Sequence, residues 1–114
     1  VDLTYVKIEK EKAYSFDILE SKTVNYSEKW KNILFEAFNY SGEKLTKLNA
    51  DYGKFLGEII NEFIQKKKLK NIDFIASHGH TIFHQPHLNY TLQIGNGAEI
   101  CAINNIKTIC DFRV

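Results

Sequence analysis

All four histidines of the chain lie in one short segment, as His78, His80, His84 and His87. Imidazole side chains two or three residues apart can converge on a zinc ion. A zinc hydrolase with an HxHxD motif would need an aspartate after the first pair, but Ile82 occupies that position. No CxxC or HExxH motif supplies further ligands. A zinc-binding or zinc-hydrolase module is therefore kept as the alternative hypothesis. For His84 and His87, we expect a solvent-exposed loop rather than a metal site.

Polar residues also follow two apolar runs that have the composition of strands. Ser77 and His78 come directly after Ile72–Ala76, and Gly79 indicates a sharp turn there. Asp111 and Arg113 close the last apolar run, and residues two apart on a strand share a face. Such a pair could orient the hydroxyl and carboxylate groups of a sugar, or it could be a plain ion pair. Ligands of α/β domains bind at the carboxyl ends of parallel strands, so these residues are candidates for a binding crevice.

A third candidate is the turn Gly95–Gly97, which leads into a short helical segment over 98–104. Asn96 could cap that helix with Glu99 in a capping box. The free amide groups of a helix N-terminus favour an anion or a polar ligand oxygen. A simple tight connection is the commoner meaning of such a turn.

The first half of the chain must form the support for these residues. Residues 1–9 and 14–24 read as two strands, and the short charged connection between them predicts an antiparallel pair. A helix capped by Ser27 follows, and a longer helix after Gly42 carries an apolar stripe at helical spacing. Gly53 and Gly57 lie one turn apart on it, which predicts close packing of another element. We expect this helix to end near Asn71.

The second half alternates short strands with one helix. Ile72–Ala76 predicts a buried parallel strand, residues 83–89 a polar loop, 90–94 a further strand and 107–112 a last strand. The order predicts an α/β layered domain. With 114 residues, the chain can hold one domain and one modest core.

Bulk properties exclude several classes of protein. The formal net charge is +1, so nothing calls for a nucleic acid or a membrane surface. No apolar run is long enough to span a bilayer. Without a signal peptide, Cys101 and Cys110 are expected to be buried free thiols in the cytoplasm. The chain has no methionine and opens on a strand, which leads us to expect that its natural N-terminus is missing.

Three segments then give a more specific signal. Residues 76–86 (ASHGHTIFHQP) resemble the SHGQTxxHxP block of the anhydro-N-acetylmuramic acid kinase family. Residues 91–98 (TLQIGNGA) are similar to its TLQIG[DN]xA block, and residues 111–113 match its DFR landmark. Val1-Asp2 resembles the end of the opening signature GTSxDGxD. The order and spacing of these blocks identify the chain with roughly the first third of a family member.

The resemblance implies a fold and a reaction. The fold would be a partial actin-like, sugar-kinase (RNase H-like) lobe, an α/β unit with a mixed sheet, flanking helices and its first strand missing. Residues 1–114 would thus be the incomplete N-terminal lobe of a two-lobe kinase. The full-length protein would use ATP and Mg²⁺ to phosphorylate 1,6-anhydro-N-acetylmuramic acid at O6 and open the anhydro ring by hydrolysis. The product, N-acetylmuramic acid 6-phosphate, belongs to bacterial cell-wall recycling in the cytoplasm.

The resemblance also implies roles for individual residues. Asp2 would belong to the ATP site, no catalytic residue lies in residues 1–114, and the base is expected in a later DTGPGN-type block. The sugar and ATP are the expected partners, without nucleic acid or membrane, and the full-length protein could form a homodimer. The residues expected to contact the sugar are Ser77, His78, His80, Thr81, Gln93, Gly95, Asp111 and Arg113.

One departure and one further hypothesis accompany this assignment. The family usually has glutamine where this chain has His80, so the contact at that position could depend on pH. Phosphoryl transfer needs groups that clamp the phosphates, so residues 1–114 by themselves are expected to be inactive. Besides the kinase and the zinc module, a non-catalytic α/β interaction domain remains a third hypothesis.

Overall fold

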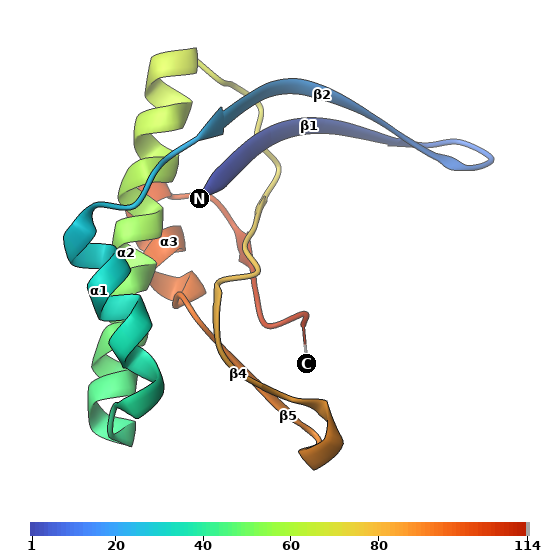
Figure 1. The fold of residues 1–114 in the computed structure, drawn as a ribbon. Helices are drawn as coiled ribbons and strands as arrows, with labels where there is room; N and C mark the ends of the chain where they lie inside the picture. The colour runs from blue at the N-terminus through green and yellow to red at the C-terminus, as the bar shows by residue number, and fades with distance from the viewer. Residues whose placement is uncertain (114) are drawn as a thin grey trace.

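The computed structural model describes residues 1–113. One long helix, α2, runs through the molecule, and a β-hairpin projects beyond it (Figure 1). The elements in chain order are β1 (Asp2–Lys10), β2 (Tyr14–Thr23), α1 (Glu28–Glu36), the 3-10 turn η1 (Ala37–Asn39), α2 (Gly42–Lys67), β3 (Ile75–Ala76), β4 (His80–Gln85), the 3-10 turn η2 (Pro86–Leu88), β5 (Tyr90–Ile94), α3 (Gly97–Asn104) and β6 (Thr108–Ile109).

The projecting hairpin consists of β1 and β2, which pair antiparallel as predicted. The register runs from Asp2 opposite Thr23 to Lys10 opposite Tyr14. A bulge interrupts it between Tyr5 and Val6, and a bulge increases the local twist. The free end of the hairpin leaves apolar side chains uncovered, with Phe16 69% exposed.

The long helix has well-defined caps at both ends. The hydroxyl oxygen of Ser41 accepts a hydrogen bond from the amide of Lys44. At the other end, Lys68 adopts a left-handed conformation with φ of 53°, and the amide of Leu69 donates to the carbonyl of Ile64 at 3.0 Å. The bonds at this carboxyl end of the helix form a Schellman motif. The predicted end at Asn71 is therefore wrong by three residues, because the left-handed residue that satisfies the last carbonyls is Lys68.

The core lies along one side of α2. Its buried members are Ala37, Leu48, Tyr52, Leu56, Ile94 and Ile100, with Trp30 and other half-buried residues packed around them. The predicted close packing at the two helix glycines is confirmed. A Cβ on Gly53 would lie 2.6 Å from the carbonyl oxygen of Asn96, and one on Gly57 would lie 2.7 Å from Cδ1 of Ile103. The absence of side chains at both positions lets α3 and the turn before it approach α2 closely.

The strands differ from the predicted single mixed sheet. Within residues 1–113 they form three two-stranded sheets: β1 with β2, β3 with β6, and β4 with β5. The pair β3–β6 is parallel as expected, but each strand has only two residues. The loop predicted over 83–89 is wrong in its first part, because His80–Gln85 forms a strand against β5. The polar residues His84 and Gln85 favoured a loop, whereas pairing with β5 makes them part of the strand.

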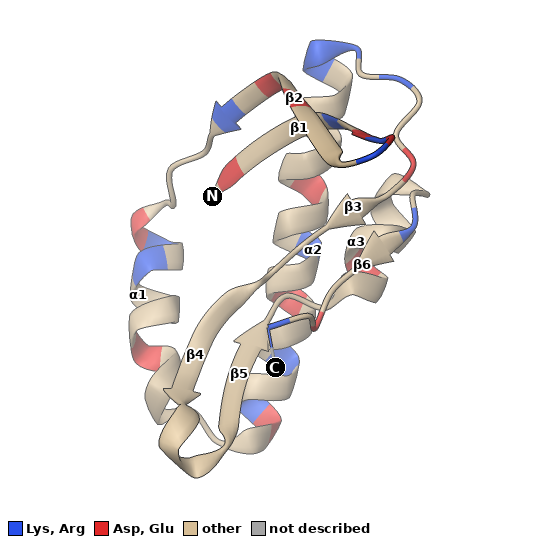
Figure 2. Cartoon of the chain, turned by 90° about the vertical axis from the view of Figure 1, so that its right-hand side faces the viewer, with Lys and Arg blue, Asp and Glu red and all other residues tan. Residues whose placement is uncertain are grey.

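Two ion pairs attach the hairpin to α2. Lys22 on β2 lies 3.1 Å from the carboxylate of Glu62, and Lys67 lies 2.8 Å from Glu20. Figure 2 shows charged residues spread over the hairpin and the helices rather than gathered in one patch. Exposed pairs of this kind contribute about 0–1 kcal/mol each. None of the helices in residues 1–113 combines the length and apolar character that a membrane-spanning segment needs.

The Gly53 contact leads to a stability prediction. Gly53→Ala should destabilise the protein by about 1–3 kcal/mol, because the Asn96 backbone cannot move away from the added methyl group as a flexible side chain could. Urea unfolding measures the effect. Gly42→Ala is the matched control, since nothing lies within 4 Å of a Cβ there. Equal stability of the two variants would contradict the packing described.

Candidate functional site

The three candidate segments from the second half of the chain meet around one pocket of about 250 Å³. Its lining comes from residues 77–79 after β3, residues 92–96 at the end of β5, and residues 110–111 after β6, together with Asn49 from α2. The prediction that the ends of the parallel strands lie together is therefore confirmed. The predicted sugar-contacting residues that line the pocket are Ser77, His78, Gln93, Gly95 and Asp111.

Two glycine turns shape one wall of this pocket. Gly79 and Gly95 have φ values of 67° and 122°, which side chains rarely tolerate. A Cβ on Gly79 would lie 2.3 Å from the carbonyl oxygen of Ile94, and one on Gly95 would lie 3.4 Å from the Cα of Gly79. The two turns therefore pack directly on each other, and this contact brings Ser77 and His78 beside Gly95.

Asn49 holds the second of these turns in place. Its side-chain oxygen accepts a hydrogen bond from the Gly95 amide at 2.7 Å, and its backbone oxygen accepts one from the Asn96 amide at 3.1 Å. Asn96 in turn accepts from the Ala98 amide and caps α3 as predicted. The capping box predicted with Glu99 is wrong, because the Asn96 amide donates to the carbonyl of Asn49 instead. Asn49 was not among the residues predicted from the sequence to form the site. The available signal was a polar residue next to Leu48 on the apolar stripe of α2.

The side chain of Gln93, on β5, is held by hydrogen bonds to one threonine of β4 and one of β5. Its side-chain nitrogen donates to the hydroxyl of Thr91 at 2.9 Å and to that of Thr81 at 3.3 Å. The Thr91 hydroxyl donates to the carbonyl of Phe83 at 3.0 Å. Thr81 is thus connected to the pocket through Gln93 but does not line it.

The last segment departs from the predicted strand over 107–112. β6 ends at Ile109, and Asp111 adopts a left-handed conformation with φ of 57°. The alternation that would place Asp111 and Arg113 on one face therefore does not apply, and exposed Arg113 lies outside the pocket lining. β3 is only two residues long, so it cannot extend the ladder further.

Cys110 is a second lining residue that sequence analysis did not assign to the site. Its thiol donates to the carboxylate of Asp111 at 3.6 Å. Partial burial, and then the neighbouring Asp111 carboxylate, raise the pKa of the Cys110 thiol. Cys101 and Cys110 are free as expected, but both are half-buried rather than fully buried.

His80 and Asp2 lie away from the pocket. The His80 ring packs edge-on against Tyr52, with 6.0 Å between ring centroids. Burial, and then the charge of His78, lower the pKa of His80. Asp2 lines a different cavity, and its carboxylate accepts a hydrogen bond from Thr23 at 2.6 Å.

The histidine cluster does not assemble a metal centre. Across residues 1–113, no three histidine, cysteine or carboxylate side chains lie close enough together to hold a metal ion. His84 is exposed at the distal end of β4, and His87 is exposed in η2, so both lie on the surface as preferred in the sequence analysis. The zinc hypothesis therefore has no support.

The arrangement is that of an α/β domain in which polar turns at the carboxyl ends of two parallel strands enclose a small pocket, the place where ligands of such domains bind. Comparison with known proteins identifies the family. The family model for anhydro-N-acetylmuramic acid kinase matches residues 1–114, and the chain belongs to this family.

Curated relatives of that name agree with the assignment. The protein from Pseudoalteromonas translucida is 37% identical over 110 residues, which cover 85% of this chain and 27% of the relative. The protein from Caldanaerobacter subterraneus is 36% identical, and the match covers 86% of this chain and 28% of the relative. The protein from Crocosphaera subtropica is 31% identical, and the match covers 99% of this chain and 31% of the relative. The chain thus spans about three tenths of the length of these relatives.

The Asn49 bonds lead to a second prediction. Asn49→Ala should lower the free energy of unfolding by about 1–3 kcal/mol, because it leaves the Gly95 amide without its acceptor. The control is Asn32→Ala on the exposed face of α1. Urea denaturation compares the two variants, and amide exchange at Gly95 reports the turn itself. An unchanged exchange rate in Asn49→Ala would show that the side chain does not hold the turn.

The environment of His80 leads to a pH prediction. Its folded-state pKa lies below the unfolded value, so the unfolded chain binds the proton more readily. The His80 contribution to stability is therefore present above about pH 6.5 and is lost as the pH falls through the depressed pKa. Urea midpoints between pH 5 and 8 should fall less steeply on the acid side in His80→Gln than in the wild-type chain. His87→Gln, at an exposed position, is the control; an equal flattening there would contradict the assignment.

Proposed function

We propose that residues 1–114 form the sugar-binding part of the N-terminal lobe of a two-lobe, actin-like kinase. The full-length enzyme transfers phosphate from ATP to O6 of 1,6-anhydro-N-acetylmuramic acid and opens the anhydro ring by hydrolysis. Its product is N-acetylmuramic acid 6-phosphate, and its role is cytoplasmic recycling of the cell wall. The observation that carries the proposal is that all three family-like blocks meet at one pocket in a chain that belongs to the family.

The pocket chemistry supports a sugar ligand. Gln93 offers an amide and His78 an imidazole, Asp111 offers a carboxylate, and the 77–79 and 95–96 turns place backbone groups at the rim. Such a mixture of donors and acceptors suits the hydroxyl and amide groups of an amino sugar. We assign Ser77, His78, Gln93, Gly95 and Asp111 to direct contacts with the sugar.

The remaining predicted residues take indirect or outer roles. Thr81 orients Gln93 through the 3.3 Å hydrogen bond between their side chains. His80 has an indirect role, because its ring packs against Tyr52 rather than lining the pocket. Arg113 is exposed two residues beyond Asp111, from where its guanidinium could pair with the carboxylate of the sugar's lactyl group.

The described residues do not form a nucleotide site by themselves. Asp2, the only residue expected there, is bonded to Thr23 and borders a largely apolar cavity. A lone carboxylate repels phosphate unless a cation lies between them. ATP supplies the phosphoryl group and Mg²⁺ neutralises its charge, and we assign their binding and the catalytic base to parts of the kinase outside residues 1–114.

A kinase assay tests the proposal. Residues 1–114 alone should show no ATP-dependent phosphorylation of 1,6-anhydro-N-acetylmuramic acid, whereas the polypeptide extended to the length of its relatives should show it. In the extended protein, Asp111→Asn should lower kcat/KM by about tenfold to a hundredfold, the loss of a hydrogen bond to a charged group.

Asp17→Asn provides the matched control, because Asp17 is exposed on the projecting hairpin. It should leave kcat/KM unchanged. Turnover by residues 1–114 alone would refute the division of labour, and an Asp111→Asn enzyme as active as the control would remove Asp111 from the sugar site.

A further inference from the structure

The side chain of Asn49 has a second polar group besides the oxygen that holds the Gly95 turn. Asn49 lines the pocket from α2, and its side-chain oxygen accepts the Gly95 amide at 2.7 Å. A backbone N–H can only donate, so this bond determines which end of the Asn49 side chain carries the oxygen. The other end is therefore the NH₂ group, which carries two donors.

This NH₂ group has no hydrogen-bond partner among residues 1–113. In the same part of the chain, the one unpaired side-chain oxygen or nitrogen that is sealed from solvent is Oδ1 of Asn104. The Asn49 nitrogen is thus unpaired but still accessible. Because Asn49 is half-buried and lines the pocket, a ligand in the pocket is the partner within reach of its donors.

Other amide donors of the pocket are already used by the protein itself. The backbone amides of Gly95 and Asn96 both donate to Asn49. The side-chain nitrogen of Gln93 donates to two threonine hydroxyls, which leaves the Gln93 oxygen as an acceptor. The NH₂ group of Asn49 is therefore a neutral group in this pocket that can only donate and that the protein leaves unpaired.

A group that can only donate is best matched by one that can only accept. The hydroxyls of a sugar do both, and Ser77 and His78 can also act in either sense. In N-acetylmuramic acid sugars, the acceptor-only groups are the carbonyl of the 2-acetamido group and the lactyl carboxylate. The carboxylate of Asp111 lies in the same pocket and repels a second carboxylate, so the neutral carbonyl is the better match for Asn49.

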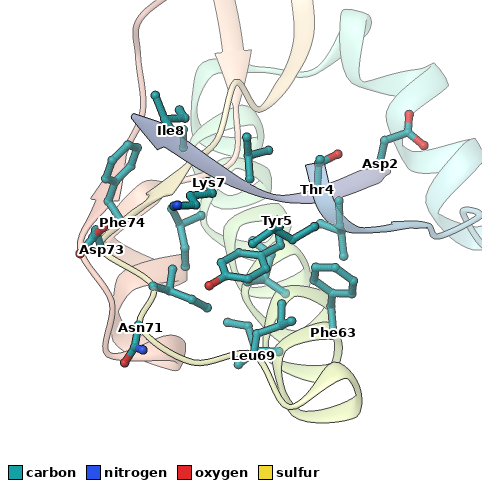
Figure 3. Close-up of a pocket in the computed structure, with 18 residues that line it drawn as sticks. Asp2, Thr4, Tyr5, Lys7, Ile8, Phe63, Leu69, Asn71, Asp73 and Phe74 are labelled. Atoms are coloured by element: carbon teal, nitrogen blue, oxygen red, sulfur yellow. The ribbon is translucent and has the colours of Figure 1, made fainter. Parts of the chain in front are cut away.

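The larger cavity of about 580 Å³, between β1 and residues 71–76, offers no equivalent group (Figure 3). Apolar side chains, among them Phe63, Leu69 and Phe74, line much of it. The hydroxyl of Tyr5 already donates to the carbonyl of Lys70 at 2.8 Å. The acetamido group is thus matched by the smaller pocket.

We propose that the NH₂ group of Asn49 donates a hydrogen bond to the acetamido carbonyl of the sugar, and that Asn49 thereby selects N-acetylated sugars over sugars with a free amine. The inference rests on the proposed function, in which this pocket binds the sugar. Asn49 then has two roles, since one end of its side chain holds the turn and the other end recognises the ligand.

Asn49→Asp separates these two roles. The carboxylate still accepts the Gly95 amide, but it has no N–H group to donate. In the extended polypeptide, amide exchange at Gly95 should stay as slow as in the wild type. The value of kcat/KM for 1,6-anhydro-N-acetylmuramic acid should fall by about tenfold to a hundredfold. Asn32→Asp adds the same charge on the exposed face of α1 and should leave kcat/KM unchanged.

The N-deacetylated form of the same sugar identifies the group that Asn49 recognises. This sugar carries an ammonium group in place of the acetamido group, so the wild-type enzyme should use it poorly. Asn49→Asp should lose most of this discrimination, because its carboxylate attracts the ammonium group. Equal losses of kcat/KM on both sugars, or an unchanged kcat/KM on the acetylated one, would overturn the inference.

A measurement on the wild-type protein keeps the test open if Asn49→Asp does not fold. The NH₂ resonances of Asn49 should shift when the acetylated sugar saturates the extended polypeptide, and those of Asn32 should not. Unshifted Asn49 resonances would also overturn the inference.

Calorimetric titration with the sugar separates this inference from the proposed function. Wild-type activity that Asn49→Asp retains defeats only the role of Asn49. Sugar binding that depends on Asn49 but leads to no phosphorylation defeats only the kinase function. Absence of sugar binding by the wild-type protein defeats both.

Discussion

The close approach of α2 to the turn before α3 is the contact on which the rest of the structure depends. Gly53 leaves room for the Asn96 backbone. Asn49, one helical turn earlier, accepts hydrogen bonds from the amides of Gly95 and Asn96. Gly57 extends the same surface to Ile100 and Ile103 of α3. A helix thus fixes a turn through backbone contacts, which tolerate little displacement.

The pocket follows from that contact through a short chain of neighbours. With Gly95 held, Gly79 packs on it and brings Ser77 and His78 to the rim. Gly97 lies against Cys110, since a Cβ there would be 2.7 Å from its Sγ, and this places Asp111 at the other side. The three segments that line the pocket therefore meet through glycines at these contacts. This explains how turns without bulky side chains can define a pocket of specific shape.

The hairpin has a weaker attachment than the pocket. It is held by Tyr5, by the pairs Lys22–Glu62 and Lys67–Glu20, and by apolar contacts near its base, while its tip stays exposed. The cavity between hairpin and β3 separates the strand pairs β1–β2 and β3–β6. The pocket and the cavity are thus lined by different features. Glycine turns and polar groups line the pocket, whereas the cavity lies between strand edges that are unpaired within residues 1–113.

Much of the fold could be predicted because local patterns determine it. The polar turn between two strand-like runs gives the hairpin, Ser27 and Ser41 cap α1 and α2, and the glycine pair marks the surface that α3 contacts. The strands at the end of the chain were less predictable. β4 has strand-favouring side chains only at Thr81, Ile82 and Phe83, between polar residues, and its pairing with β5 defines it as a strand. The final strand stops at Ile109 because its partner is two residues long.

The sequence by itself determined the family and five of the eleven residues that line the pocket, because these depend on residue types at fixed spacing. Only the tertiary structure decided which of them share the pocket. It separated Gln93 and Asp111, which line the pocket, from His80, which packs on Tyr52, and from Arg113, which lies outside the lining. It also added Asn49 and Cys110. The reason is physical: spacing along a chain fixes local geometry, whereas proximity between distant segments depends on how closely their backbones can pack.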